Sequence, residues 1–431
     1  MNRKIIATVM GVMVLLLGCS FVQQSKTMAS DPVTPSETLT PTPPTVRETA
    51  NPQLQEANVK FGFNLWRQLQ QQEGVENTFI SPTSVTVALS LLLQGADGTT
   101  QQEMLEVLEL QGMSLEDINS ANQALYRSLG EAGEGVELAI ANSLWTHEGI
   151  SFKPEFLQAN RQYYDAEVES LDFASPETLG RINTWVSENT EGKITEIIDR
   201  ISPDDVLYLI NAIYFKGNWT RQFDPEETQS KPFFIDDSAD SVEQNSSTET
   251  TVSVEMMSQS GEYRYAENEE FQAVSLPYGE EQHLSMYIFL PRPDSNLQEF
   301  SQQLTAENWQ LWMQRFGRRD GKIELPRFKM EYEMRLNEAL QALGMETIFS
   351  PQAATFSKMT DEPVVVNEVK HKTFVEVNEE GTEAAAVTSI GVRTTSMPPP
   401  PFEMVVNRPF FFAIRDDRTG MVLFMGSMVE P

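Results

Sequence analysis

Side chains that could carry out acid–base, nucleophilic or metal chemistry are scarce in this chain of 431 residues. It contains one cysteine, Cys19, and three histidines, His147, His283 and His371. A hydrolase needs a histidine beside its nucleophile and an acid that orients the histidine, and the chain has no Gly-x-Ser-x-Gly turn. No spacing of His, Cys and carboxylates indicates a metal site. We therefore expect neither an enzyme nor a resident metal or cofactor.

The segment 379–388 is rich in small side chains and reads Glu-Glu-Gly-Thr-Glu-Ala-Ala-Ala-Val-Thr. Alternate side chains of a strand face opposite sides, so a strand that pivots at Gly381 would have one small face and one partly charged face. The small face would be Thr382, Ala384, Ala386 and Thr388, and the other face Glu383, Ala385 and Val387. No proline interrupts this segment, which therefore suits a strand that inserts between two paired strands. Because Glu-Ala-Ala-Ala also favours helix, a surface helix is the alternative.

The charge balance is strongly acidic, since 31 Lys and Arg against 63 Asp and Glu give a net charge of −32. Attraction to phosphate needs clustered Lys and Arg, so the composition argues against nucleic acid as a partner. No basic patch indicates a heparin-like polyanion. We interpret the excess acid as a source of solubility. With a single cysteine, no intramolecular disulfide can form.

Residues 1–18 have the pattern of a lipoprotein signal peptide. Two basic residues precede an uncharged apolar run at 5–17. This run is shorter than the roughly 20 residues of a membrane span and suits a signal-peptide core. It ends in Leu-Leu-Gly-Cys, which resembles the bacterial lipobox, so Cys19 is the predicted lipidation site; an ordinary secretory signal is the alternative. The lipid would anchor the protein to a membrane on its periplasmic or cell-surface side.

The remaining chain divides into a Ser/Thr/Pro-rich tether at 19–52, which cannot bury enough apolar surface to fold, and a folded region at 53–431. Apolar periodicity places helices mainly first and strands mainly last, which indicates an α+β architecture. The acidic segment 236–253 is a predicted exposed loop. The expected helices are 61–69, 81–95, 101–110, 115–129, 154–164, 179–186 and 335–343, and the expected strands 136–145, 168–173, 206–215, 274–276, 284–290, 410–415 and 422–428.

Several motifs resemble those of the serpin family and follow one another in the order found in that family, over residues 53–431. They are Asn-Thr-Phe-Ile-Ser-Pro-Thr-Ser at 77–84, the segments 210–219, 369–377 and 325–328, which resemble the third, fifth and sixth strands of the main sheet, and the closing strands around 407–410 and 424–426. The segment 379–386 resembles the hinge of the reactive centre loop in inhibitory members. The resemblance implies about nine helices packed on three β-sheets, with an exposed reactive centre loop at about 380–402.

The resemblance also implies three groups of functional residues. They are a hinge (Glu379, Gly381, Thr382, Ala384, Ala385 and Ala386), a cluster that controls opening of the main sheet (Ser81, Ser84, Asn211 and His371), and a group where the loop enters that sheet (Trp219, Arg327 and Glu379). The alternative for His371 is a core histidine bonded to the backbone. Arg327 would pair with Glu379, as a basic residue does in some serpins.

By the same resemblance, counting 17 residues from Glu379 places the scissile bond at Thr395–Ser396. A threonine before the bond would favour an elastase- or subtilisin-like serine protease. The alternative bond, Arg393–Thr394, would suit a trypsin-like protease.

The resemblance implies an inhibitory serpin, a monomeric suicide inhibitor that traps serine proteases, with cysteine proteases as a second class, by inserting its cleaved loop. The competing hypothesis is a non-inhibitory serpin-fold binding or carrier protein. A third is a surface protein whose folded domain only mediates contact.

Overall fold

The computed structural model of the chain describes residues 51–74, 76–130, 133–235, 251–382 and 400–431. The predicted signal peptide, Cys19, all of the tether up to residue 50, and most of the acidic segment lie outside these ranges. So do the hinge alanines and both candidate scissile bonds.

The described residues contain nine α-helices, most of them in the first half of the folded region. They are α1 (Pro52–Glu73), α2 (Pro82–Leu93), α3 (Gly98–Val107), α4 (Leu115–Gly130), α5 (Pro154–Tyr164), α6 (Glu177–Asn189), α7 (Leu297–Gln303), α8 (Ala306–Met313) and α9 (Asn337–Ala342). Helix α1 begins with a proline at its first position, and the side chain of Asn51 accepts the backbone N–H of Gln53 and Leu54. Such a cap satisfies donors that a helix start leaves unpaired.

A six-stranded sheet carries the candidate site. Its order is β10 (Phe328–Arg335), β11 (Glu368–Val377), β4 (Leu207–Asn218), β2 (Val136–His147) and β3 (Glu167–Leu171), and the two-residue β12 (Gly381–Thr382) pairs with β4. Ten of the twelve residues of β4 are buried. A strand covered on both faces is expected to be almost continuously apolar, as its sequence is.

The remaining strands form a nine-stranded sheet of order β1 (Thr78–Ile80), β15 (Val422–Met428), β14 (Phe410–Asp416), β8 (Leu284–Pro291), β7 (Phe271–Tyr278), β6 (Thr251–Glu267), β9 (Gly317–Pro326) and β13 (Phe402–Val405), with β5 (Gln229–Phe234) pairing β6. The described residues thus contain two hydrogen-bonded sheets where we expected three. The reason is β6, a strand of 17 residues that pairs with β5 at its start and with β7 at its end. It joins strands that would otherwise belong to separate sheets.

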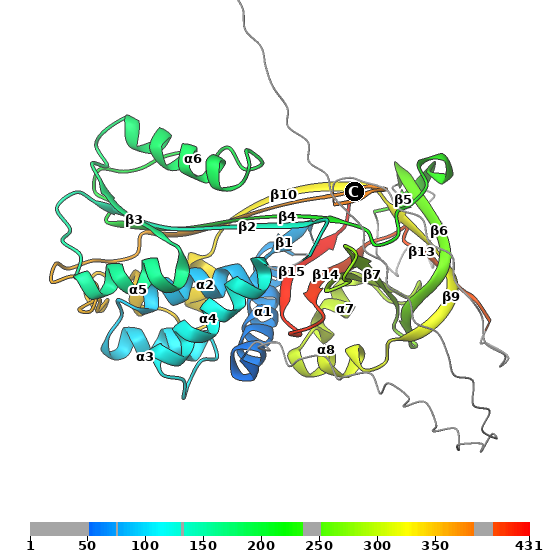
Figure 1. Ribbon diagram of the computed structural model, residues 1–431, viewed down its shortest axis with the longest axis horizontal. Coiled ribbons are helices and arrows are strands. Elements are labelled where there is room, and N and C mark those ends of the chain that lie inside the picture. The colour runs from blue at the N-terminus through cyan, green and yellow to red at the C-terminus, as the bar shows by residue number, and fades with distance from the viewer. Residues whose placement is uncertain (1–50, 75, 131–132, 236–250, 383–399) are drawn as a thin grey trace, which may run out of the picture. The chain divides into compact units, whose positions relative to one another are not determined.

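Helices and the second sheet cover the six-stranded sheet on its two faces (Figure 1). On one face lies α6, which buries Ile182 and Trp185 in a smaller core cluster with Tyr214 and Phe374 of the sheet. On the other face lie α2 and the strands β14 and β15, which share the main core. Helix α2 is buried over its whole length, so it is fixed between the two sheets.

All of the predicted helices and strands are present, although most of their boundaries differ by a few residues, and α1 begins at Pro52 rather than at residue 61. Residues 251–253 of the predicted acidic loop begin β6, and Arg335 ends β10 before α9 starts at Asn337. The motif at 325–328 spans the junction of β9 and β10, so only its last residue belongs to the six-stranded sheet.

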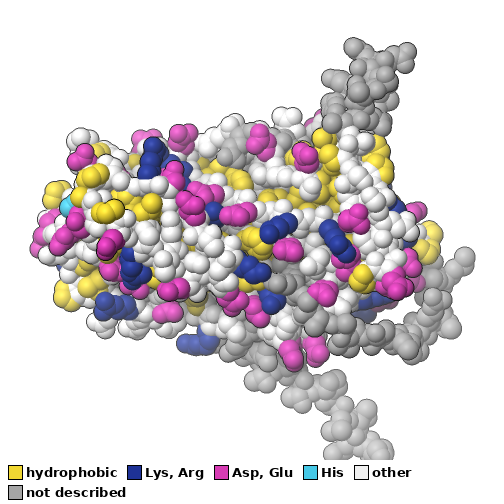
Figure 2. All heavy atoms as spheres, turned by 90° about the horizontal axis from the view of Figure 1, so that it is seen from above, with side chains coloured by type: hydrophobic (Ala, Val, Ile, Leu, Met, Phe, Trp, Pro, Cys, Tyr) yellow, Lys and Arg dark blue, Asp and Glu magenta, His cyan; other side chains and the backbone are white. Residues whose placement is uncertain are grey.

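No helix within the described ranges is long and apolar enough to cross a membrane. On the face that Figure 2 shows, acidic side chains are interspersed with Lys and Arg.

Candidate functional site

The boundary between β4 and β11, here called the seam, is the centre of the candidate site. The two strands run parallel and pair from Glu368↔Tyr208 to Phe374↔Tyr214. Beyond this point the strands part: β11 continues to pair with β10, and β4 with β2. The free edge of β4 at this end pairs antiparallel with β12, through Gly381↔Asn218 and Thr382↔Gly217. The chain therefore already enters the gap between β4 and β11 at the predicted pivot.

Gly381 is required at the pivot for two physical reasons. Its φ is 138°, in a region that side chains rarely adopt. A Cβ there would lie 2.3 Å from the backbone oxygen of Gly217 and 2.5 Å from the backbone nitrogen of Trp219. Asn378 closes the tight turn, because its backbone N–H donates to the oxygen of Gly381 over 2.9 Å.

The segment 219–223, which follows β4, holds the backbone just before this pivot. The backbone N–H of Trp219 donates to Glu380 O (3.0 Å), and that of Phe223 donates to Glu379 O (2.9 Å). The indole N–H of Trp219 donates to Asn378 O over 2.9 Å. The sequence predicted Trp219 at this place but not Phe223 or Asn378. These two residues act through backbone groups, which do not depend on the type of side chain.

Glu379 and Arg327 form the ion pair that the resemblance implied. The Nε of Arg327 donates to Glu379 Oε1 over 2.7 Å, and the hydroxyl of Thr228 donates to the same oxygen. The Glu379 side chain is 5% exposed and that of Arg327 is 43% exposed. Burial by itself would raise the pKa of Glu379, but hydrogen bonds from Arg327 and Thr228 outweigh it and hold the pKa below its ordinary value. Thr228 was not predicted.

The four residues of the predicted sheet-opening cluster lie together at the seam. The His371 ring on β11 is 2.6 Å, Nδ1 to Oδ1, from Asn211 on β4, and Asn211 Nδ2 donates to Ser84 Oγ. The backbone N–H of Ser81, which caps α2, donates to His371 Nε2 over 3.0 Å. The cluster therefore ties both strands of the seam to the start of one helix. Its control of opening stays a prediction.

These contacts determine the form of the histidine. Because Nε2 accepts from Ser81, Nδ1 carries the proton and donates to Asn211. Burial lowers the pKa of His371 to about 3, since a ring shielded from solvent is poorly stabilised in its charged form. The ring is thus neutral at ordinary pH. The alternative of a histidine satisfied by backbone alone is wrong, because one of its partners is a side chain.

The hydrogen bonds continue beyond the predicted cluster. Asn211 Nδ2 also donates to Asn142 Oδ1 on β2 over 2.7 Å, and Asn142 in turn bonds the hydroxyl of Tyr126 on α4. Sequence reasoning did not single out Asn142 or Tyr126. Asn211 was predicted from the family resemblance; an asparagine in an otherwise apolar strand, which needs a partner when buried, is a signal that could have pointed to Asn142 as well.

The far end of the predicted loop is held by the nine-stranded sheet. Strand β13 pairs parallel with β9 from Phe402↔Gly321 to Val405↔Glu324. The Phe402 ring stacks on Tyr265 with ring centroids 3.9 Å apart. A Cβ at Gly321 would come within 2.5 Å of three atoms of the Phe402 ring, so only glycine leaves room for it.

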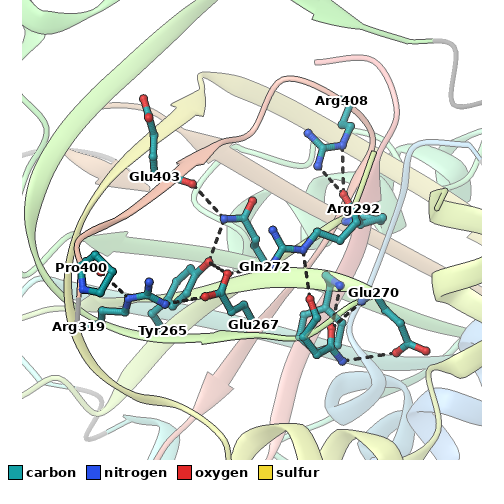
Figure 3. Close-up of polar contacts among 12 residues, drawn as sticks. Tyr265, Glu267, Glu270, Gln272, Arg292, Arg319, Pro400, Glu403 and Arg408 are labelled. Atoms are coloured by element: carbon teal, nitrogen blue, oxygen red, sulfur yellow. Dashed lines mark hydrogen bonds and ion pairs between the residues drawn. The ribbon is translucent and has the colours of Figure 1, made fainter. Parts of the chain in front are cut away.

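Figure 3 shows the polar contacts around this far end of the loop. These contacts, β13 and Gly321 are together called the distal anchor. Arg319 donates to Pro400 O (3.0 Å) and to Glu267 (2.7 Å), and Arg292 donates to the other oxygen of Glu267 (2.8 Å). Hydrogen bonds from Arg319 outweigh burial and hold the pKa of Glu267 below its ordinary value. Burial also raises the pKa of Tyr265 to about 12. One carboxylate thus orients two guanidinium groups at the base of the loop.

No group of three or more His, Cys, Asp or Glu side chains in the described ranges could hold a metal ion. The site is instead an arrangement of strands. A parallel pair of strands parts at one end, a glycine pivot starts into the gap, and the loop is held again at a second sheet. This combination defines a protein in which a short strand already pairs with one edge of a gap in the main sheet.

Comparison with known proteins assigns this class to a family. The model of the serpin (serine protease inhibitor) family matches residues 56–431. Human Serpin B8 is 36% identical over 389 residues, covering 88% of this chain and 99% of the relative. Leukocyte elastase inhibitor from Sus scrofa is 34% identical over 389 residues, covering 88% and 100%. The chain belongs to the serpin family.

Solved structures agree with this assignment. The thermophilic serpin tengpin in its native state has a TM-score of 0.79 at 30% identity, covering 90% of this chain and 96% of that one. Human thyroxine-binding globulin has a TM-score of 0.77 at 27% identity, covering 88% and 99%. The predicted α+β serpin fold is therefore confirmed.

Proposed function

We propose that the protein is an inhibitory serpin, a suicide inhibitor that traps serine proteases, and also cysteine proteases, as covalent complexes. The observation that carries the proposal is the seam, where β4 and β11 part and β12 begins an antiparallel strand in the gap. Because the loop is captured at its pivot before any cleavage, insertion has only to extend a pairing that already exists.

In this mechanism the nucleophile of the protease attacks the carbonyl carbon of Thr395. An ester or thioester forms, the peptide bond breaks, and the amine of Ser396 leaves with a proton. Insertion of 14 residues, 382–395, at about 3.3 Å each would then carry the attached protease roughly 45 Å. Distortion of its oxyanion hole, where each donor accounts for about 10²–10³ in rate, would stop the hydrolysis that normally frees the enzyme.

The named relatives support a protease as the partner. Leukocyte elastase inhibitor bears the name of a target, and Thr395 would suit an elastase- or subtilisin-like pocket. Arg393 would offer a trypsin-like protease another bond. The chain would act as a monomer, since the site uses one copy of each strand.

The second candidate is a non-inhibitory binding or carrier protein, which the similarity to thyroxine-binding globulin keeps open. The hinge argues against it. Proline or a bulky charged residue on the inserting face would block insertion, whereas this face carries Thr382, Ala384 and Ala386.

Two measurements test the proposal. We expect complexes that survive SDS with at least one serine protease, and a freed C-terminal peptide that begins at Ser396 or, for a trypsin-like enzyme, at Thr394. We also expect loop-cleaved protein to melt tens of degrees above intact protein, because the cleaved form gains a strand. Equal melting of the two forms, with no stable complex, would favour the carrier.

We further propose that Cys19 carries a lipid, which places the inhibitor on the outer side of a membrane. The lipobox-like run before Cys19 supports this. Cys19→Ala should move the protein from the membrane fraction to the soluble fraction. Retention of the variant on the membrane with normal processing would contradict it.

A further inference from the structure

A cavity of about 440 Å³ lies against the segment 219–223 that holds the hinge backbone. Its walls come from this segment, from β6, β7, β8 and β9, and from the turns after β7 and β14. None of residues 378–382 lines it, and a different cavity contacts Asn378 and Glu379. The segment 219–223 therefore has the hinge on one side and this cavity on the other.

The cavity combines apolar walls with cationic side chains. Phe223, Tyr263 and Leu276 line it and are at most 6% exposed. Three arginines line it too, Arg221, Arg264 and Arg318, against two carboxylates, Glu262 and Asp417, in a chain with twice as many acidic as basic residues. An apolar body with one anionic group matches such a lining.

The arginines differ in how their charge is compensated. Arg318 pairs with Glu262 over 2.9 Å, and Arg264 lies 3.7 Å from Asp417. Arg221 donates to the backbone oxygen of Ser260 over 2.6 Å, and no carboxylate pairs with it in the described part of the chain. Its remaining N–H groups are thus available to an anion, and a guanidinium binds carboxylate or sulfonate through two parallel hydrogen bonds.

We propose that this cavity binds an amphipathic anion, an aromatic or branched carboxylate or sulfonate, whose charged group meets Arg221 and whose apolar body packs on Phe223, Tyr263 and Leu276. The bound molecule regulates the hinge. It packs against Phe223, whose backbone N–H holds Glu379 O, and restrains the end of β4 that must separate from β11. The binding site stands on its own, whereas the regulatory effect rests on the proposed inhibitory function.

Binding is tested first, with 2-naphthalenesulfonate as the anionic probe and 2-naphthalenesulfonamide as its uncharged match. Titration calorimetry should give at least tenfold tighter binding of the sulfonate. Ser275→Phe, which fills the cavity from a buried position on β7, should remove binding of both probes. Arg221→Gln should lower the affinity for the sulfonate to that for the sulfonamide.

A matched control uses the cavity of about 470 Å³ between α1 and α8. Gln310→Phe fills that cavity and should leave sulfonate binding unchanged. The proposed site would be overturned by equal affinity for the two probes or by no binding at millimolar concentration. It would also be overturned if Gln310→Phe lost binding while folded Ser275→Phe retained it. Melting curves of both variants establish that they are folded.

The regulatory effect is tested with a protease that the parent inhibits. Saturating sulfonate should at least double the number of inhibitor molecules consumed per protease in the parent, with no change in Ser275→Phe. Binding without this increase would overturn the coupling to the hinge. If the parent inhibits no protease even without a probe, the proposed function fails, and the binding result still decides the site.

Discussion

The two ends of the predicted reactive centre loop are held in different ways. At the proximal end, β12 adds only two residues of pairing to β4, and the pivot is a glycine at φ 138°. At the distal end, β13 forms a four-residue ladder with β9, a ring stacks on Tyr265, and Arg319 bonds Pro400 O. In the proposed mechanism, a loop that inserts at one end after cleavage would need a weakly held start and a firmly held finish. The contrast fits a proximal end that would move first and a distal end that would stay with the body of the protein.

The largest effect should come from a charge on the inserting face. Thr382→Arg would bring an unpaired ion into the sheet interior at several kcal/mol. Hydrolysis and insertion compete from one acyl-enzyme, so each 1.4 kcal/mol of added barrier shifts the outcome tenfold. The variant should be cleaved at the parental bond as a substrate, with active protease released. The measurement is the number of inhibitor molecules consumed per enzyme inhibited.

Glu383→Arg is the matched control, since alternation puts residue 383 on the outer face. It should inhibit nearly as well as the parent. Stable complexes of Thr382→Arg at the parental stoichiometry would remove the basis of the inserting-hinge argument.

The distal end is tested by filling the space that Gly321 leaves. Gly321→Val would place methyl groups where the Phe402 ring lies, and overpacking of this kind costs about 1–3 kcal/mol. Strand β13 should loosen, which hydrogen exchange of residues 402–405 would report as faster exchange. Gly317→Val in the same strand is the control, because a Cβ at Gly317 would meet nothing within 4 Å. Equal exchange in both variants would mean that the ring does not hold the strand.

The distal anchor also shows where sequence reasoning stops. Gly381 could be predicted because a glycine before a run of small residues marks a pivot, and its backbone geometry explains why. Gly321 was not singled out, although an isolated glycine in a strand often marks a close approach. Its partner Phe402 lies 81 residues away, and nothing in either sequence context links the two. The pairing becomes visible only when β13 and β9 are placed side by side.

The cluster at the seam also combines residues that are far apart in the sequence. His371 and Asn211 are 160 residues apart, and resemblance to a family placed them together before the structure did. The structure then determined what spacing could not: the hydrogen bond from Ser81 fixes the tautomer of His371, and burial lowers its pKa. Thr228, Asn142 and Phe223 were missed because common residue types contribute here through only one or two hydrogen bonds each.

The pH dependence of the seam follows from His371. Its pKa falls from the ordinary value of 6.5 to about 3 in the folded protein, so below pH 6.5 the unfolded state binds the extra proton. Stability should therefore be fully present above about pH 6.5 and fall as the pH drops towards 3, by at most about 1.4 kcal/mol per pH unit. His371→Gln cannot take up this proton and should show a shallower loss of melting temperature. His147→Gln, on β2 and outside the hydrogen-bonded cluster of His371, should follow the parent. An unchanged slope in His371→Gln would refute the assignment.

The smallest effect is expected when an arginine is replaced by glutamine at each end of the loop. Arg327→Gln removes the cation beside Glu379, and because the arginine is 43% exposed, the pair contributes only roughly 0–1 kcal/mol. A loss of about 1 kcal/mol should speed opening of the seam about fivefold, measured as the rate at which a labelled peptide of residues 382–395 incorporates into intact protein. Arg319→Gln should leave this rate unchanged and instead raise hydrogen exchange at 402–405. If Arg319→Gln accelerated peptide incorporation as much as Arg327→Gln, the two ends would not be independent, and a fixed distal end could no longer be assumed.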